Sequence, residues 1–465
     1  GIGHDHNPAL PFHRYPTLNP SPAELVRRDL AVVWHPCTQM RDHETLPMVP
    51  IRSARGVWLE GHDGKRYLDA ISSWWVNLFG HAHPRLDAAL RDQIGTLEHV
   101  ILAGFTHEPA IELAERLVAI APEGLTRVQY ADNGSSAVEI ALKLAFHHCR
   151  NRGDARRTKF VALAGGYHGE TLGALSVTDI PLYRETYAPL LLTPLTAPSP
   201  DTTLARPDET ALDVAMRAAD ALDALLAEHG DTICALIIEP LVQCAAGMRM
   251  HDPEYLRRAR AACDRHGVVM IADEIAVGFG RTGTLFACEQ AGISPDLMCL
   301  SKGLSGGYLP LSAVLATEAI YQSFYDEYTR LRAFLHSHSY TGNALGCRVA
   351  LEVLNVFRDE PVLERNRALA LHLADALAPL RHHPQVRHLR QTGMIAAFDL
   401  VDADGRAFDW TERRGLRVVR HGLERGVLLR PLGHTVYVMP PYCITPDEID
   451  FMVGVARESI ELAIA

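Results

Sequence analysis

The stretches VVMIADE at residues 268–274 and DLMCLSKGLSGGYLP at residues 296–310 decide the fold of this chain. Each contains a short apolar run that ends in polar residues. Apolar runs that alternate with helical segments are typical of parallel strands buried on both faces. We therefore predict an α/β fold with a large, doubly wound and mostly parallel sheet. The other runs of this kind are RVQYA (127–131), KFVALA (159–164), CALIIEP (234–240) and SAVLAT (312–317).

The chain exceeds the length at which a single core keeps growing, so two domains are expected. The strand runs and the helical spacing between them assign residues 71–345 to the large domain. Residues 346–465 contain long helices followed by short strands, which predicts a smaller α+β domain. Residues 1–70 should form an arm, extended over about the first 30 residues, and part of the small domain. This part includes a hairpin in 47–70 that turns at HDGK.

The composition favours a function in small-molecule chemistry. The 465 residues include 45 basic and 56 acidic ones, a net charge of −11, with no dense basic run, so nucleic acid is not an expected partner. The sequence has neither a signal peptide nor the roughly 20 apolar residues that span a membrane, which predicts a cytoplasmic protein. The nine cysteines form no CxxC pair and the paired histidines match no ligand motif, so we expect no disulfide framework and no metal site.

Two candidate catalytic residues follow the strands quoted first. Ligands bind at the carboxyl ends of the strands in open α/β sheets. Asp273 ends its strand as a carboxylate that needs a partner, which could be a protonated pyridine nitrogen or the start of the next helix. Lys302 lies between a buried strand and a glycine-rich turn, where burial favours the neutral amine of a Schiff-base lysine over an ordinary surface lysine.

Two turns complete the candidate site. Gly134, Ser135 and Ser136 open a helix, where free N–H groups bind phosphate, although such residues also serve as plain helix caps. Tyr167 in GGYHGET could stack on a flat heteroaromatic ring or simply be half-buried in a glycine-rich turn. A phosphate turn, an aromatic face, an acid and a lysine thus follow one another on successive strand ends. This order favours one shared ligand.

The segments IADEIAVGFGRTG (271–283) and SKGLSGGYLP (301–310) resemble the signature of the class III aminotransferases, enzymes of fold type I that use pyridoxal 5′-phosphate. The resemblance implies that Lys302 forms the Schiff base with this cofactor and that Asp273 holds its pyridine nitrogen. It also implies the remaining cofactor contacts, which are phosphate binding by Gly134 and Ser135, ring contact by Tyr167, and completion of the phosphate site by His338 and by Ser339 reaching over from a second subunit. A homodimer is therefore expected, with the active sites at its interface.

Other segments are similar to a narrower group of this family, which converts 7-keto-8-aminopelargonate into 7,8-diaminopelargonate in biotin biosynthesis. These segments are ISSWW (71–75), LAGFTHEPAIELA (102–114), GGYHGETLGALSV (165–177), LLRPLG (428–433) and VYVMPPY (436–442). The similarity implies that Trp74 lines the substrate pocket, with core packing as its alternative role. It further implies that Arg430 pairs with the substrate carboxylate with help from Arg281. Tyr167, Lys302 and Ser337 are the other expected substrate contacts.

Two departures from the family pattern concern the substrates. Cys37 stands in WHPCT where the family usually has tyrosine, and HSHSYTGN places His338 and Ser339 where proline and threonine are common. S-adenosylmethionine is the expected amino donor, but the HSHSYTGN and GGYLP stretches also resemble relatives that use lysine. The charge of Glu170 suits either donor. The rival functions are another class III aminotransferase acting on ω-amino acids and a non-enzymatic, metal-binding role.

Overall fold

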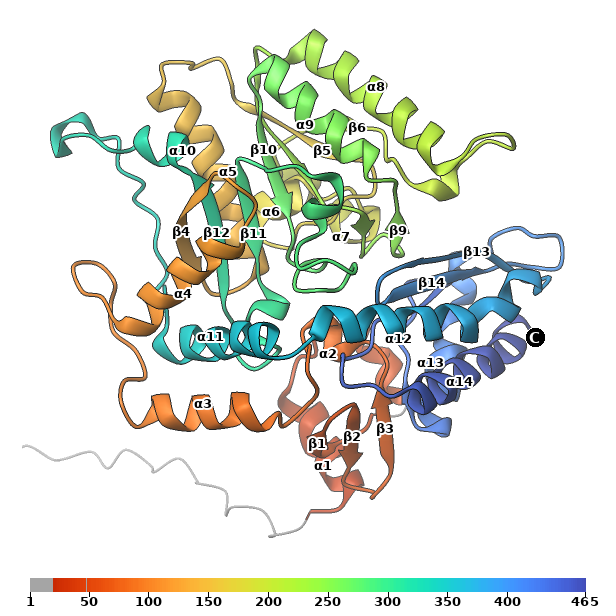
Figure 1. Ribbon diagram of the computed structural model, residues 1–465. Coiled ribbons are helices and arrows are strands. Elements are labelled where there is room, and N and C mark those ends of the chain that lie inside the picture. Colours follow the sequence, from red (N-terminus) through yellow and green to blue (C-terminus); the bar gives the residue numbers. More distant parts are fainter. Residues whose placement is uncertain (1–19, 47) are drawn as a thin grey trace, which may run out of the picture.

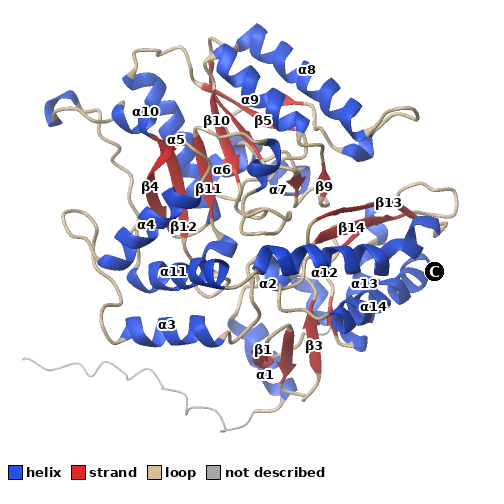
Figure 2. Ribbon diagram, in the orientation of Figure 1, coloured by secondary structure: helices blue, strands red, loops and turns tan. Residues whose placement is uncertain are grey.

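A seven-stranded sheet with helices on both faces forms the centre of the molecule (Figures 1 and 2). The computed structural model describes residues 20–46 and 48–465. The strand order is β4-β12-β11-β10-β7-β5-β6, and six of the seven strands run in the same direction. The strands span Leu125–Ala131 (β4), Lys159–Leu163 (β5), Leu195–Ala197 (β6), Ile233–Ile238 (β7), Val269–Asp273 (β10), Leu297–Leu300 (β11) and Ser312–Thr317 (β12). The predicted doubly wound, mostly parallel sheet is confirmed.

The strand over SAVLAT corrects one detail of the prediction. It was grouped with the parallel strands, yet β12 is antiparallel to both β11 and β4. Parallel neighbours need a crossover of a dozen or more residues, usually a helix. Only residues 301–311 connect β11 to β12, and they form the turn that carries Lys302. The strand therefore returns beside its predecessor in the opposite direction.

Burial explains why the runs form strands. Every residue of β7 and of β10 is buried, and the apolar side chains of β7 are divided between two apolar clusters. Helix α5 (Gly134–Asn151) covers one face of the sheet, whereas α8 (Ala211–His229) and α9 (Glu254–His266) cover the other. Both faces of the sheet are therefore removed from water, which fits its continuous apolar strands.

The N-terminal part differs from the expected extended arm. Residues 1–19 lie outside the described part, but α1 (Pro22–Val32) is helical. Ser21 caps this helix by accepting a hydrogen bond from the Glu24 amide, and proline occupies the first turn. The predicted hairpin around HDGK is present between β2 and β3 and gains a third strand. The four-stranded sheet comprises β1 (Ile51–Arg55), β2 (Trp58–Gly61), β3 (Arg66–Asp69) and β15 (Val427–Leu428).

The C-terminal region has the expected helices and short strands. Figure 1 shows α12, α13 and α14 beside β13 and β14, below and to the right of the large sheet. These two strands belong to a three-stranded sheet of order β13-β14-β16. The predicted division at residues 70 and 345 stays a prediction. The elements are α11 (Ala344–Asp359), α12 (Val362–Leu377), β13 (Val386–Thr392), β14 (Ile395–Leu400), α13 (Gly415–Arg425), β16 (Thr435–Val438) and α14 (Pro446–Ile464).

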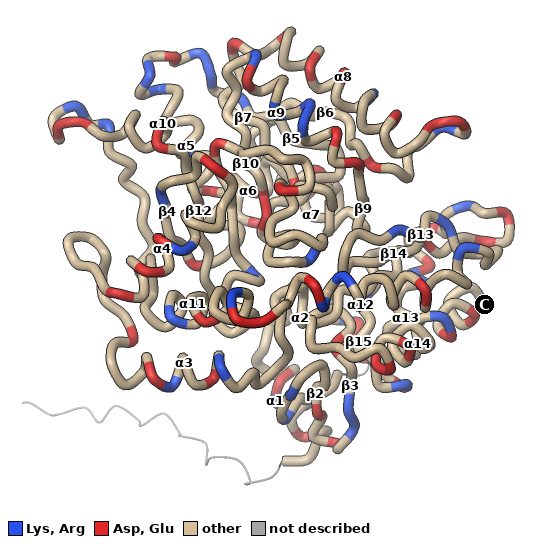
Figure 3. The backbone as a smooth tube through the Cα atoms, viewed as in Figure 1, with Lys and Arg blue, Asp and Glu red and all other residues tan. Residues whose placement is uncertain are grey.

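The remaining elements are short or peripheral. They are α2 (Ser72–Trp75), α3 (Pro84–Ile94), α4 (Glu108–Ile120), α6 (Leu172–Ser176), α7 (Pro181–Arg184), β8 (Val242–Gln243), β9 (Arg249–Met250) and α10 (Glu318–Gln322). Figure 3 shows basic and acidic residues interspersed over the tube. Across residues 20–46 and 48–465, none of the helices combines the length and the apolar character needed to span a membrane.

Candidate active site

A cavity of about 190 Å³ lies at the carboxyl ends of the parallel strands. This is where open α/β sheets bind ligands. The cavity brings together Lys302, Asp273, Gly134, Ser135 and Tyr167, which were predicted from four separate segments. Its other lining residues are Trp75, Asn133, His168, Gly169, Glu239, Ile275, Ala276 and Val277.

Lys302 follows β11 after a single serine, Ser301, and lines this cavity. Its backbone has a φ of 44°, in the left-handed region that side chains rarely adopt, so the turn holds this residue in a strained conformation. The amine lies 5.2 Å from the centre of the Trp75 ring. Burial lowers the pKa of Lys302, although the nearby Asp273 opposes this shift. The site therefore favours a neutral, nucleophilic amine.

Asp273 is buried at the end of β10, where two donors fix its carboxylate. The His168 ring nitrogen Nδ1 lies 2.7 Å from Oδ2, and the Ile275 amide donates to Oδ1 at 3.1 Å. His168 was not among the residues predicted from the sequence. Its position in GGYHGET, directly after Tyr167, was the available signal. The pair presents a buried negative group that can hold a cationic ring nitrogen.

Glu239 is a second buried carboxylate that the sequence analysis missed. It accepts hydrogen bonds from the Tyr167 and Cys244 amides, both at 3.0 Å. Burial raises the pKa of Glu239 to about 7, and the neighbouring His168 opposes this shift. Glu239 follows the apolar run of β7 just as Asp273 follows β10, so the same argument from strand ends would have found it.

The turn before α5 forms a cradle for an anion. Asn133 caps the helix by accepting from the Ser136 amide at 3.0 Å, which leaves Gly134 and Ser135 in the first turn facing the cavity. A Cβ atom on Gly134 would come within 3.1 Å of the Ile275 side chain, so only glycine fits without displacing it. The amides of a helix N-terminus bind phosphate well. Amine, acid and anion cradle together fit pyridoxal 5′-phosphate.

An unusual turn positions the two tryptophans. All four residues of α2 have positive φ, from 47° at Ser73 to 72° at Trp74 and Trp75. The buried carboxylate of Asp69 accepts hydrogen bonds from the amide and hydroxyl of Ser73, at 2.8 and 2.7 Å. The Trp75 indole donates to the Tyr437 hydroxyl at 3.0 Å. These bonds offset the strain and direct Trp75 inward, whereas Trp74 stays partly exposed.

The structure brings Trp74 and Arg430 together but places Arg281 elsewhere. The Arg430 guanidinium lies 5.0 Å from the centre of the Trp74 ring. The Arg281 guanidinium is fully buried, and it donates to the backbone carbonyls of Trp75, Asn77 and Pro440 at 2.8–3.2 Å. Arg281 therefore braces the tryptophan turn from behind in this structure.

Ser337, His338 and Ser339 lie on a loop outside the cavity. Over the described part of the chain, none of the three lines this pocket. His338 lies 2.9 Å from His336 and 3.4 Å from Asp132, the residue before the phosphate turn. Ser337 and Ser339 are exposed, as a contribution to a second subunit would require. Their roles in binding stay predictions.

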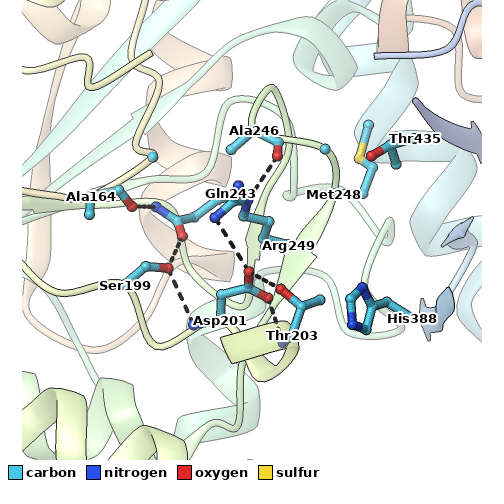
Figure 4. A network of polar contacts seen from close by, with 12 residues as sticks. Ala164, Ser199, Asp201, Thr203, Gln243, Ala246, Met248, Arg249, His388 and Thr435 are labelled. Carbon is cyan, nitrogen blue, oxygen red and sulfur yellow. Dashed lines mark hydrogen bonds and ion pairs between the residues drawn. The ribbon is translucent and has the colours of Figure 1, made fainter. Parts of the chain in front are cut away.

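A buried polar network supports the turn that carries Tyr167 (Figure 4). The side chain of Gln243 donates to the Ala164 carbonyl at 3.0 Å and accepts from the Ser199 hydroxyl at 2.5 Å. The Asp201 amide donates in turn to this hydroxyl, and Arg249 lies 3.5 Å from the Asp201 carboxylate. The network includes Gln243 of β8 and Arg249 of β9, so it holds the start of the GGYHGET turn against these two strands.

A family model described as Aminotransferase class-III matches residues 38–460. The chain belongs to the class-III aminotransferase family. The aminotransferase is 47% identical over 430 residues to the adenosylmethionine-8-amino-7-oxononanoate aminotransferase of Helicobacter pylori, covering 91% of this chain and 95% of that one. Identity to the protein of the same name in Geobacter sulfurreducens is 43%, with 92% and 95% of the two chains covered.

Solved structures of aminotransferases have the same fold as this chain. The adenosylmethionine-8-amino-7-oxononanoate aminotransferase of Methanocaldococcus jannaschii superimposes with a TM-score of 0.89 at 35% identity, covering 94% of this aminotransferase and 98% of that chain. An omega transaminase of Pseudomonas jessenii in complex with PMP gives 0.90 at 29% identity, with the same coverage. The predicted family, fold type and pyridoxal 5′-phosphate cofactor are therefore confirmed.

Proposed function

We propose that this aminotransferase converts 7-keto-8-aminopelargonate, also called 8-amino-7-oxononanoate, into 7,8-diaminopelargonate in biotin biosynthesis. The observation that carries the proposal is the pairing of Arg430 with Trp74, the sequence neighbour of the Trp75 that lines the cavity with Lys302. A long apolar chain that ends in a carboxylate needs an aromatic wall and a distant guanidinium. Relatives that are 43–47% identical carry the name of this activity.

Lys302 is the proton carrier of this proposal. Bound pyridoxal 5′-phosphate supplies an electron sink for the carbon that loses its proton. The Lys302 amine, whose pKa burial lowers, accepts a proton from the α-carbon of the donor and later returns one to the acceptor. Asp273 would hold the pyridine nitrogen in its protonated form, with His168 fixing the carboxylate. Gly134 and Ser135 would hold the phosphate.

We propose S-adenosylmethionine as the amino donor, with lysine as the alternative. The Tyr167 hydroxyl donates a hydrogen bond to the Glu170 carboxylate at 2.9 Å. A carboxylate beside aromatic rings attracts a cation, whether sulfonium or ammonium. The relatives with adenosylmethionine in their names favour the first donor.

The direct test supplies the purified enzyme with the keto acid and each donor in turn. Diamine is expected with S-adenosylmethionine and not with lysine, as measured by mass spectrometry. If diamine forms with lysine and not with S-adenosylmethionine, the proposed donor is wrong but the proposed acceptor stands. Efficient amination of ω-keto acids such as succinate semialdehyde, without any reaction of 7-keto-8-aminopelargonate, would contradict the proposed function and favour the ω-amino acid rival.

We further propose that the enzyme is a homodimer. Large apolar side chains are exposed on neighbouring segments around α3, α4 and the loop before α11, which lie on one side in Figure 1. The His99 ring and the Ser339 carbonyl, 2.8 Å apart, link two of these segments. Stable interfaces bury about 1,200–2,000 Å², and obligate ones are apolar. The exposed side chains are Ile94, Ile101, Phe105, Ile111, Tyr328, Leu331, Leu335 and Tyr340.

Sedimentation should show a dimer of the 51.3 kDa chain. Leu335→Asp places a charge among these apolar side chains, so it is expected to weaken the dimer about tenfold or more. Leu462→Asp is the matched control, because this leucine is also exposed but lies at the end of α14, away from the surface in question. A fully active wild-type monomer would contradict the proposal.

A further inference from the structure

We infer that the hydroxyl of Tyr183 binds the carboxylate of the keto acid together with Arg430. This inference rests on the proposed function, because it assigns a second group to the same carboxylate subsite. Tyr183 belongs to the short helix α7, which follows the GGYHGET turn after helix α6. It was not among the residues that the sequence indicated.

Cys37 links Tyr183 to Arg430 in space. The Cys37 thiol lies 3.8 Å from the Tyr183 hydroxyl, and the Cys37 carbonyl lies 3.4 Å from Nη2 of Arg430. The guanidinium and the phenol therefore flank one small residue. The Tyr183 ring also meets the Tyr167 ring edge-on, with the ring centres 5.6 Å apart, so it adjoins the cofactor cavity that Tyr167 lines.

The Tyr183 hydroxyl is available to bind a ligand. Within residues 20–46 and 48–465, its one polar contact is the long one to the Cys37 thiol, and a thiol is a weak hydrogen-bonding partner. Burial raises the pKa of Tyr183 to about 12, opposed by Arg430, so the hydroxyl keeps its proton at neutral pH. A protonated phenol beside a guanidinium can donate to a carboxylate, and such charge-assisted bonds are strong.

The geometry separates this role from that of Tyr167. The Tyr167 hydroxyl already donates to Glu170, and the Tyr437 hydroxyl accepts from the Trp75 indole. The Tyr183 hydroxyl, which lies close enough to Arg430 for the guanidinium to lower its pKa, has only the long contact to the Cys37 thiol. A tyrosine that only packs against Tyr167 would be replaced by phenylalanine without loss. A tyrosine that binds the carboxylate would not.

The test compares Tyr183→Phe with the wild-type enzyme, both loaded with cofactor. Nonanoate is the equilibrium probe, because it has the apolar chain and carboxylate of the substrate but no reacting groups. Calorimetry should show its Kd raised about tenfold by Tyr183→Phe, as the loss of one hydrogen bond to a charged group predicts. Nonanamide should bind both proteins equally. Arg430→Met is the positive control and should weaken nonanoate by more.

Kinetics supply the second readout. Tyr183→Phe should raise KM for the keto acid about tenfold and leave the half-reaction with the amino donor within about twofold of wild type. Unchanged binding of nonanoate, or equal losses for nonanoate and nonanamide, would overturn the inference. If the wild-type enzyme binds nonanoate as expected but does not aminate the keto acid, the proposed function fails while the carboxylate subsite stands.

Discussion

Replacing Lys302 with alanine is expected to lower the rate of transamination about 10³-fold or more, because positioned proton transfer and a covalent amine both disappear. Among the described residues that line the cavity, Lys302 is the only amine. Cofactor binding should persist through Asp273 and the phosphate turn. The measurements are steady-state rates, single-turnover rates and the cofactor content of the variant.

The absorbance spectrum gives an independent readout of the Lys302 prediction. The wild-type enzyme should show a band near the visible edge that borohydride bleaches, and Lys302→Ala should lack the protein-bound product of this reduction. Lys65→Ala is the matched control, since Lys65 is exposed in the HDGK turn. Normal turnover by Lys302→Ala would refute the assignment of the cofactor lysine and, with it, the mechanism.

Strand ends made the centre of the site predictable from sequence. Asp273 and Lys302 each follow a continuous apolar run, and parallel strands bring such positions to one edge of a sheet. Gly134 and Ser135 follow a third run and open a long helix. In each case a local pattern identifies the residue, and the fold class then implies that they meet. The cavity contains all four.

The residues that escaped prediction depend on contacts between distant segments. His168 contacts Asp273 across 105 positions, and its place directly after Tyr167 does not by itself indicate this contact. The role of Arg281 was inferred from a motif, but its burial behind the tryptophan turn depends on carbonyls contributed by two other segments. Sequence patterns report local periodicity, whereas such pairs depend on tertiary packing.

The direction and conformation of the backbone were also difficult to predict from the sequence. The run SAVLAT has the composition of a buried parallel strand, and only the shortness of the preceding connection indicates its reversal. The left-handed turn at ISSWW contains no glycine that would indicate its positive φ angles. Asp69, from a neighbouring strand, stabilises this turn by accepting a hydrogen bond. Its strain is located where the substrate is expected, as is common at binding sites.

Asp273→Asn is expected to slow both half-reactions about 10²-fold or more, because a preorganised charge at the reacting centre is lost. Asparagine keeps the shape of the side chain and can still accept from the Ile275 amide, but it carries no charge to hold a pyridine nitrogen in its protonated form. Half-reaction rates followed through the absorbance of the bound cofactor measure this loss, and thermal unfolding shows whether the variant is folded.

Glu239→Gln separates this electrostatic role from a general need for buried acids. Both carboxylates lie in the cavity, yet burial raises the pKa of Glu239 to about 7, so Glu239 already carries a proton part of the time near neutral pH. Glu239→Gln should therefore lower the rate by less than about tenfold, which is a much smaller loss than that expected for Asp273→Asn. Equal losses in the two variants would mean that Asp273 has no special relation to the cofactor. A large loss confined to Asp273→Asn, with Asp273→Glu retaining part of the rate, would show that the negative charge at this position supports catalysis.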